Sequence, residues 1–472
     1  MLSPPPSLGG ERESIPQGRK TFAPEIYIPI NKTYITRMQP TINRYFLFIL
    51  LFFSLLHVIS RAGTNHIPSV RIQGTTDPAL PIHSTDEAFL LRGTKGYFWT
   101  PAQYLEEIPV LKNYGMNFLV TCYGSFFRDY AFKEGHNDWW IPMNIERKQE
   151  WQQVIRACQE NGIKFCFGIN PMLFSSQPLD TNRDEDFRRL LELYRWFQEQ
   201  GVEWFYLALD DLHLHKGMRV DGKGQSLFVN KLYTALLQHN SSCKMIFCPT
   251  WYWGSSIENS DKRAYLEEVA EFLHKDILTF WTGNDVVSPT VTVVDAEAYR
   301  KVIGHELVLW DNYPVNDFHN TLNIGPLTGR DPELHNAVFG IIANPMRDNR
   351  MNRLPLYTMA DYMNDPIGYN PEESITRAIH TVAEDQFAEE TLLRLVQYYP
   401  GGIIHGYTST KYSVIRKKFE QLLDEDRSAA QRYVDELAQI LVQLEKAFPE
   451  VYGDSKEVIS NDLKWMNEQL SK

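Results

Sequence analysis

The 472-residue chain has few cysteines, no glycine-rich phosphate loop and no excess of positive charge. Its five cysteines are odd in number and form no Cys-x-x-Cys pair, which argues against both a disulfide framework and a zinc site. A net charge of −12 argues against nucleic acid as a partner, because phosphate binding needs a basic face. We therefore expect a protein that needs no metal and no cofactor. The hydrophobic content of 43% and the aromatic content of 13% are typical of a well-packed globular protein.

The chain also lacks an apolar run of ordinary membrane-spanning length, which is about 20 residues. Its longest run, Tyr45 to Ser60 (YFLFILLFFSLLHVIS), follows Arg44 and has the length of a signal-peptide core. A start at Met38 instead of Met1 would give this signal peptide an ordinary length. A type II membrane anchor is the alternative. Both predict a main domain in the secretory lumen or outside the cell, and the sequon Asn240-Ser241-Ser242 is compatible with either.

Changes in composition along the chain predict its domain organisation. The predicted parts are a disordered extension (1–43), a signal peptide or anchor (44–60), a linker (61–85), a catalytic barrel (86–362) and a helical C-terminal domain (363–472). In the last part, the segments Thr376 to Gln397 and Tyr412 to Phe448 show amphipathic helical spacing.

Short apolar runs alternate with helical patterns through the barrel segment. The runs are Phe89–Gly93, Asn117–Cys122, Lys164–Ile169, Trp204–Leu209, Lys244–Cys248, Ile277–Trp281, Glu306–Trp310 and Val338–Ala343. The clearest amphipathic helices between them are Glu185 to Gln200 and Arg147 to Glu160. This alternation predicts an α/β fold with a parallel sheet, most simply a (β/α)8 TIM barrel. A doubly wound open sheet is the alternative, but no nucleotide-binding loop follows the first strand.

Two consecutive aspartates, Asp210 and Asp211, stand where the fourth apolar run stops. A barrel presents catalytic groups at the C-terminal ends of its strands. Two neighbouring carboxylates do not both ionise readily, so one keeps its proton to higher pH and the pair can divide acid and electrostatic roles. A solvated loop start or a helix N-cap is the structural alternative.

Other candidate site residues follow further strands, and they are aromatic, amide, carboxylate or glycine residues. They are Gly96, Tyr252, Trp310, Asn312, Asp317 and Asn344. Aromatic rings that stack on a sugar and polar groups that hold its hydroxyls are typical of a carbohydrate site. Each residue also has a structural alternative, since a tryptophan often belongs to the core and Asn-Pro often forms a turn.

The same strand ends carry a family resemblance. The motifs are LALDDLH, FCPTWYWG, FWTGNDVVS, LWDNYPVNDF followed by LNIGPLTGRDPEL, and the Asn-Pro at 344–345. From about Leu91 to Tyr362 the chain resembles glycoside hydrolase family 84, the β-N-acetylglucosaminidases that include the eukaryotic O-GlcNAcases and bacterial enzymes once called hyaluronidases. The resemblance implies a retaining exo-β-N-acetylglucosaminidase acting on a glycan or glycoconjugate that contains N-acetylglucosamine.

In this family the substrate's own 2-acetamido oxygen attacks C1 and forms an oxazoline, an exception to the two-carboxylate scheme. The resemblance implies that Asp210 orients the acetamido N–H, and that Asp211 protonates the leaving oxygen and then activates water. Tyr252 is implied to bind the acetamido oxygen beside an apolar wall from Trp310. Asn312 is implied to line the same pocket, and Asp317 and Asn344 to hold sugar hydroxyls.

The first two strand-end loops depart from the family pattern. The resemblance implies that the backbone of Gly96 approaches the sugar ring, but Lys95 stands at the usual glutamate and Phe98 at the usual tyrosine. The residues 122–128 (CYGSFFR) replace a stretch whose lysine contacts the substrate. Lys95 or Arg128 could supply the missing cation. These departures leave open a catalytically impaired, carbohydrate-binding member of the family.

A metal site is a further alternative, because Asp211, His213 and His215 alternate and would share one face of an extended segment. A surface loop is the plainer interpretation, since these histidines lie beyond the strand end.

Overall fold

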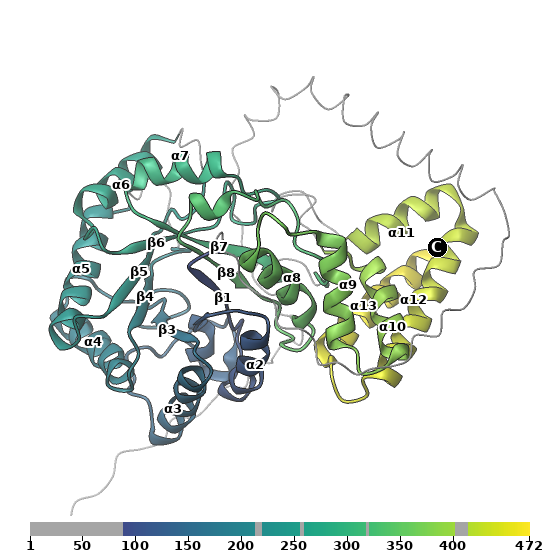
Figure 1. Ribbon diagram of the computed structural model, residues 1–472, viewed down its shortest axis with the longest axis horizontal. Coiled ribbons are helices and arrows are strands. Elements are labelled where there is room, and N and C mark those ends of the chain that lie inside the picture. Colours follow the sequence, from purple (N-terminus) through teal and green to yellow (C-terminus); the bar gives the residue numbers. More distant parts are fainter. Residues whose placement is uncertain (1–87, 213–219, 255–258, 318–320, 402–413) are drawn as a thin grey trace, which may run out of the picture. The chain divides into compact units, whose positions relative to one another are not determined.

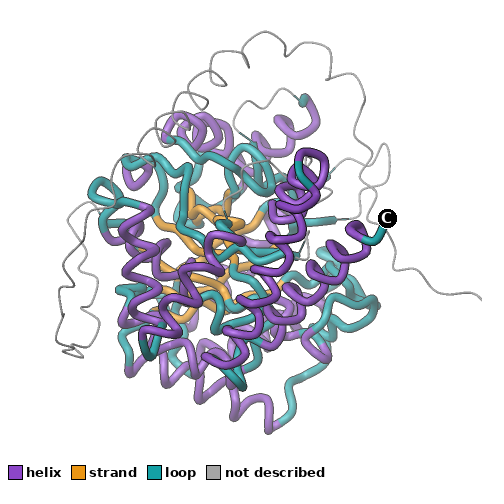
Figure 2. The backbone as a smooth tube through the Cα atoms, turned by 90° about the vertical axis from the view of Figure 1, so that its right-hand side faces the viewer, coloured by secondary structure: helices purple, strands orange, loops and turns teal. Residues whose placement is uncertain are grey.

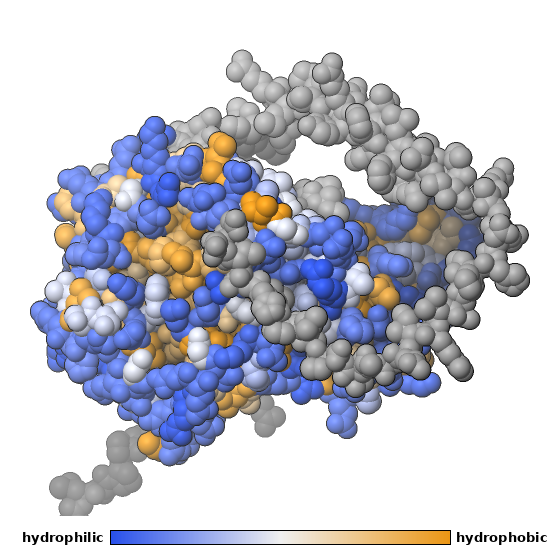
Figure 3. Space-filling model, in the orientation of Figure 1, coloured by the Kyte–Doolittle hydropathy of each residue, from blue (hydrophilic) through white to orange (hydrophobic). Residues whose placement is uncertain are grey.

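The computed structural model describes residues 88–212, 220–254, 259–317, 321–401 and 414–472. The predicted extension, the apolar segment 44–60 and the linker lie outside the described residues. Among the helices that the model describes, none combines the length and the apolar character that crossing a membrane requires. On the face shown in Figure 3, hydrophilic residues cover most of the surface, with apolar patches between them.

Eight parallel strands form a closed barrel, so the predicted TIM barrel is confirmed and the open sheet is excluded. The strands are β1 (Leu91–Lys95), β2 (Phe118–Val120), β3 (Lys164–Ile169), β4 (Trp204–Ala208), β5 (Lys244–Cys248), β6 (Leu278–Trp281), β7 (Leu307–Pro314) and β8 (Gly340–Asn344). Strand β1 closes the barrel by pairing with both β2 and β8. Figures 1 and 2 show the strands at the centre of a ring of helices.

The barrel helices follow the strands in the expected alternation. They are α2 (Pro101–Asn113), α3 (Ile145–Glu160), α4 (Asp184–Glu199), α5 (Gly222–His239), α6 (Ser260–Phe272), α7 (Val293–Ile303) and α8 (Arg353–Asn364). Short 3-10 turns are η2 (Tyr123–Phe126), η3 (Arg128–Tyr130) and η4 (Leu334–Asn336). Helix α2 begins with a capping box in which Thr100 and Gln103 each bond the other's backbone N–H.

The chain after the barrel is helical, as predicted, but its helices are shorter than the amphipathic pattern suggested. They are α9 (Pro371–Val382), α10 (Gln386–Tyr398), α11 (Val414–Glu425), α12 (Arg427–Ala447) and α13 (Gly453–Leu470). Both predicted long helices are interrupted by an aspartate that caps a new helix. The Asp385 carboxylate accepts the N–H of Ala388, and the Asp426 carboxylate accepts the N–H of Ser428.

The barrel strands are buried on both faces, which explains why they appear as apolar runs. All five cysteines are buried and unpaired, and burial raises the pKa values of the Cys166 and Cys248 thiols. A hydrogen bond between the Ser455 hydroxyl at the start of α13 and the Asp348 carboxylate (2.8 Å) joins the last helix to the loop after β8.

Candidate active site

A cavity lies at the C-terminal ends of the strands, with about 490 Å³ of empty space when its open mouth is counted. Every predicted site residue except Gly96 lines it, namely Asp210, Asp211, Tyr252, Trp310, Asn312, Asp317 and Asn344. The lining also includes Lys95, which the sequence offers as a candidate cation, and Tyr123 from the altered stretch 122–128. Further lining residues that were not candidates are Tyr97, Phe132, Cys248, Phe280, Thr282 and Val286. The barrel thus brings together groups that are far apart in the chain.

The two aspartates line the same cavity because the backbone turns between them. Successive residues of an extended strand point to opposite sides. Strand β4 ends at Ala208, however, and Asp211 has a φ of 53°, in the left-handed region that aspartate tolerates better than most residues. This turn directs both carboxylates to the mouth of the barrel.

Asp210 is the more deeply buried carboxylate of the pair, with 6% of its surface exposed. Burial raises its pKa to about 7, and the neighbouring charge of Asp211 acts in the same direction. Asn170, at the end of β3, opposes this by donating a 2.9 Å hydrogen bond from its side-chain nitrogen to the Asp210 carboxylate. The Asn170 side-chain oxygen accepts the backbone N–H groups of Met172 and Leu173, which fixes the orientation of the amide.

Tyr252 contacts the second aspartate. Its hydroxyl donates a 2.9 Å hydrogen bond to the Asp211 carboxylate, and burial followed by the charges of the two aspartates raises the pKa of the phenol well above its ordinary value. Tyr252 is therefore a neutral hydrogen-bond donor. Its predicted bond to an acetamido oxygen stays a prediction, since the hydroxyl is bonded to Asp211 here.

Trp310 forms one wall of the cavity. Its ring packs edge-on against Phe280, with ring centroids 5.0 Å apart, and the Lys95 ammonium lies 4.2 Å from the centroid of its ring. The wall is therefore aromatic, and a cation lies against it.

A chain of amides links the sixth, seventh and eighth strand ends. The Asn312 side-chain nitrogen donates to the Val286 carbonyl oxygen (2.6 Å), and the Asn344 side-chain nitrogen donates to the Asn312 side-chain oxygen (2.7 Å). Because a carbonyl only accepts, both amide orientations are determined. The Asn344 side-chain oxygen is left as a buried acceptor without a hydrogen-bond partner among the residues that the structure describes.

Asp317 lies at the rim, where the residue as a whole is exposed to solvent but its carboxylate is partly desolvated. The Tyr97 hydroxyl donates a 3.2 Å hydrogen bond to its carboxylate. Desolvation raises the Asp317 pKa, whereas the positive charge of Lys95 lowers it. The rim therefore offers an accessible carboxylate that a tyrosine orients.

Gly96 has a different surrounding from the predicted one. A Cβ added at this position would lie 2.5 Å from the Tyr104 ring and 2.7 Å from the Trp99 ring, so packing behind the barrel requires the glycine. The Tyr104 hydroxyl donates to the Gly96 carbonyl oxygen at 3.2 Å. These two rings occupy the space where a side chain would lie, and the predicted approach of the Gly96 backbone to a sugar ring stays a prediction.

The structure distinguishes between the two candidate cations. Lys95 ends β1, has 3% of its surface exposed and lines the cavity. Arg128 instead binds Asp138, with a 2.9 Å hydrogen bond from its Nε, and its side chain is largely exposed. The cation in the cavity therefore comes from the first strand.

A buried ion pair supports the seventh strand end. Arg330 and Asp311 have side chains that are 4% and 2% exposed, and the Arg330 Nε donates to the Asp311 carboxylate at 2.8 Å. Asp311 lies between Trp310 and Asn312, so this pair fixes the backbone that carries two lining residues.

The comparison with known proteins agrees with the motifs. Residues 92–397 match the β-N-acetylglucosaminidase family. The chain belongs to this family, glycoside hydrolase family 84. It is 28% identical over 333 residues to the Protein O-GlcNAcase of Mus musculus and to that of Rattus norvegicus, covering 66% of this chain. The chain spans about a third of the length of these relatives, at 34%.

Solved structures of similar fold include a mutant of an O-GlcNAc hydrolase from Thermobaculum terrenum, with a TM-score of 0.62, 24% identity and coverage of 80% of this chain and 82% of that one. Another is "Structure of CpGH84B", with a TM-score of 0.61, 23% identity and coverage of 81% and 68%. Both support the barrel fold. As a member of family 84, the chain is classified among the glycoside hydrolases of the hexosaminidase type.

The alternative metal site falls partly outside the described residues, since His213 and His215 lie in the segment 213–219. Across the described ranges, no three His, Cys, Asp or Glu side chains gather in a way that could hold a metal ion.

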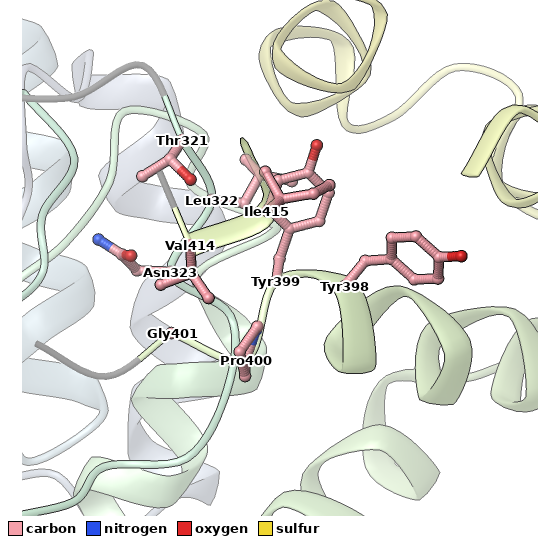
Figure 4. A pocket seen from close by; sticks show the side chains of 9 residues that line it. All are labelled: Thr321, Leu322, Asn323, Tyr398, Tyr399, Pro400, Gly401, Val414 and Ile415. Atoms are coloured by element: carbon pink, nitrogen blue, oxygen red, sulfur yellow. The ribbon is translucent and has the colours of Figure 1, made fainter. Parts of the chain in front are cut away.

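A second hollow lies where the segment after β7 meets the end of α10 (Figure 4). Its described lining comprises Thr321, Leu322, Asn323, Tyr398, Tyr399, Pro400, Gly401, Val414 and Ile415. Among the described residues, this lining carries no carboxylate, histidine, lysine or cysteine side chain.

Proposed function

We propose that the protein is a retaining exo-β-N-acetylglucosaminidase, which removes terminal β-linked N-acetylglucosamine through an oxazoline intermediate. The observation that carries the proposal is the pair Asp210 and Asp211, two carboxylates in one cavity with different surroundings. Asp210 is buried and bonded by Asn170, whereas Asp211 is bonded by the Tyr252 hydroxyl. Unlike surroundings allow two adjacent acids to take different roles.

Substrate binding assigns the proton within this pair. The N–H of a 2-acetamido group that donates to Asp210 favours the ionised form of that carboxylate and lowers its pKa from about 7. The negative charge on Asp210 then favours the protonated form of Asp211, because the two carboxyl groups are adjacent. Asp211 can therefore donate its proton to the glycosidic oxygen as the bond to C1 breaks.

The acetamido oxygen forms the new bond to C1, and Asp210 stabilises the positive charge on the resulting oxazolinium. Asp211, now ionised, takes a proton from a water molecule that attacks C1 and reopens the ring. Two inversions at C1 give net retention. The Tyr252 hydroxyl can bond either Asp211 or the acetamido oxygen, and its high pKa keeps it a donor throughout.

The test is hydrolysis of 4-nitrophenyl N-acetyl-β-glucosaminide by the purified protein. We expect release of nitrophenol, the β-anomer as the first product in a proton NMR time course, and no activity in the Asp211→Asn variant. Replacing the substrate's acetyl group with a trifluoroacetyl group should slow the reaction strongly, because fluorine makes the amide oxygen a poorer nucleophile. An equal rate with both substrates would contradict assistance by the acetamido group.

The second candidate is a catalytically impaired carbohydrate-binding protein. The observation that favours it is the altered cavity wall, in which the Lys95 ammonium lies over the rings of Trp310 and of Tyr123, a residue of the altered stretch 122–128. Binding of N-acetylglucosamine without turnover of the aryl glycoside would support this candidate over the enzyme.

We further propose that the barrel acts in the secretory lumen or outside the cell, on a glycan or glycoconjugate that ends in N-acetylglucosamine. The apolar segment 45–60 and the sequon at Asn240 support this location.

A further inference from the structure

The proposed mechanism gives the Lys95 side chain no role, although the side chain lines the cavity. It is almost completely buried, with 3% of its surface exposed. A buried ammonium loses its hydration and destabilises the fold unless other groups replace the lost hydrogen bonds.

Aromatic rings surround the ammonium. Its nitrogen lies 4.2 Å from the ring centroid of Trp310, 5.1 Å from that of Tyr123 and 5.8 Å from that of Tyr97. Among the described residues, no carboxylate lies within 4.0 Å of this nitrogen and no oxygen accepts a hydrogen bond from it. Ring faces attract the positive charge but leave its N–H donors without oxygen acceptors. An acceptor can reach them through the cavity.

The neighbouring strand end carries the complementary group. Strand β1 pairs with β8 so that Thr94 lies opposite Ala343, and the next residue of each strand is Lys95 and Asn344, respectively. The Asn344 side-chain oxygen is a buried acceptor, and among the described residues it has no hydrogen-bond partner. An unused donor and an unused acceptor thus stand at adjacent strand ends of one cavity.

This combination selects between two kinds of ligand. A hydroxyl group both accepts and donates, so it can satisfy Lys95 and Asn344 at once. A sulfate or carboxylate substituent only accepts, so it would satisfy Lys95 but face the Asn344 oxygen and the carboxylate of Asp317 in the same cavity. The surroundings of Lys95 therefore favour an uncharged sugar.

We propose that Lys95 and Asn344 together bind one hydroxyl group of the terminal sugar, Lys95 as the donor and Asn344 as the acceptor. Lys95 is then a specificity-determining residue for an uncharged N-acetylglucosamine unit. This inference rests on the proposed function and adds a contact that the mechanism of the aspartate pair does not require.

The experiment compares wild-type protein with Lys95→Met, which keeps the length and apolar stem of the side chain. The substrates are 4-nitrophenyl N-acetyl-β-glucosaminide and its 3-, 4- and 6-deoxy analogues. We expect Lys95→Met to lower kcat/KM for the full substrate roughly 10- to 100-fold, the effect of losing one hydrogen bond to a charged group. One deoxy analogue should be a poor substrate for the wild type and should lose nothing further in the variant.

The matched control is Lys112→Met. Lys112 lies in the last turn of α2, where its ammonium donates to the Asn161 carbonyl oxygen at the surface. This control should behave as wild type with all four substrates. A uniform loss in Lys95→Met across the deoxy series would mean that Lys95 only supports the fold, and it would overturn the proposal. The proposal would also be overturned if the wild type preferred a 6-O-sulfated substrate over the uncharged one and this preference disappeared in Lys95→Met.

Failure of the proposed function has a separate signature, because wild-type protein would then release no nitrophenol from any substrate. In that case, calorimetric binding of N-acetylglucosamine and its three monodeoxy analogues to wild type and Lys95→Met tests the contact in the same way. If the wild type binds none of these sugars, the proposed function and the role of Lys95 are both wrong.

Discussion

Replacing Asp210 with asparagine should stabilise the folded protein at alkaline pH while it removes activity. Asparagine has nearly the same shape and can still accept the hydrogen bond from Asn170, but it carries no charge. In the folded protein the pKa of Asp210 is about 7, whereas its ordinary value is 3.8, so the folded protein keeps this proton up to a higher pH. The interval of about three pH units corresponds to about 4 kcal/mol of unfolding free energy.

The sign follows from proton binding. Between pH 3.8 and about pH 7 the folded protein keeps a proton that the unfolded chain has lost, so the free energy of unfolding falls as the pH rises through this window. Above pH 7 the folded protein carries the full penalty of a buried carboxylate. The Asp210→Asn variant lacks this penalty. It should match the wild type near pH 4 and exceed it by up to about 4 kcal/mol near pH 8.

The assay is urea unfolding followed by circular dichroism at pH 4, 6 and 8. The matched control is Asp424→Asn, which removes the charge of an exposed aspartate on α11 and should change stability little at any pH. A variant that gains the same stability at pH 4 as at pH 8, or none at pH 8, would refute the buried-charge reasoning.

Three further predictions concern single side chains. Asn170→Ala removes a hydrogen bond that lowers the Asp210 pKa, so the acid limb of the pH profile of kcat/KM should move up by about 1 to 2 pH units. A fall in kcat/KM of equal size at every pH would instead indicate structural damage alone. Arg330→Met leaves the Asp311 carboxylate buried without its partner and should lower the free energy of unfolding, measured in urea, by about 3 to 5 kcal/mol. An unchanged midpoint of urea unfolding would show that the ion pair contributes little to stability. If the barrel enters the secretory lumen, protein from a eukaryotic secretory host should lose mass on glycosidase treatment and the Asn240→Gln variant should not, whereas wild-type protein without a glycan would count against that location.

The barrel was predictable because its strands are buried on both faces. The apolar runs Lys164–Ile169 and Lys244–Cys248 coincide with β3 and β5. Other boundaries moved by a few residues, and β7 continues to Pro314 through the polar residues Asp311 and Asn312. Apolar periodicity does not reveal such an extension, because Asp311 and Asn312 are polar residues whose burial is stabilised by an ion pair and by hydrogen bonds.

Much of the site was predictable from one rule, that groups after barrel strands meet at one mouth. The rule succeeded for Asp210 and Asn344, which end different strands and line one cavity. For Gly96 the rule does not reveal that the rings of Tyr104 and Trp99 fill the space beside the glycine, and the predicted contact of its backbone with a sugar stays a prediction. It also gave no reason to select Asn170, whose importance comes only from its contact with Asp210. Such contacts depend on the register between strands, which a single sequence does not contain.

The amide chain from Val286 through Asn312 to Asn344 also bears on how such a pocket could change its preference. The main-chain oxygen of Val286, in the loop between β6 and α7, determines whether the oxygen or the nitrogen of the Asn344 amide faces the ligand. If that oxygen moved away, Asn312 could rotate by half a turn and Asn344 would follow. The pocket would then offer an N–H group where it now offers an oxygen, without any substitution among the residues that touch the sugar. A change in the loop between β6 and α7 could in this way make the cavity prefer a hydrogen-bond acceptor on the ligand in place of a donor, while Asp210 and Asp211 stayed unchanged.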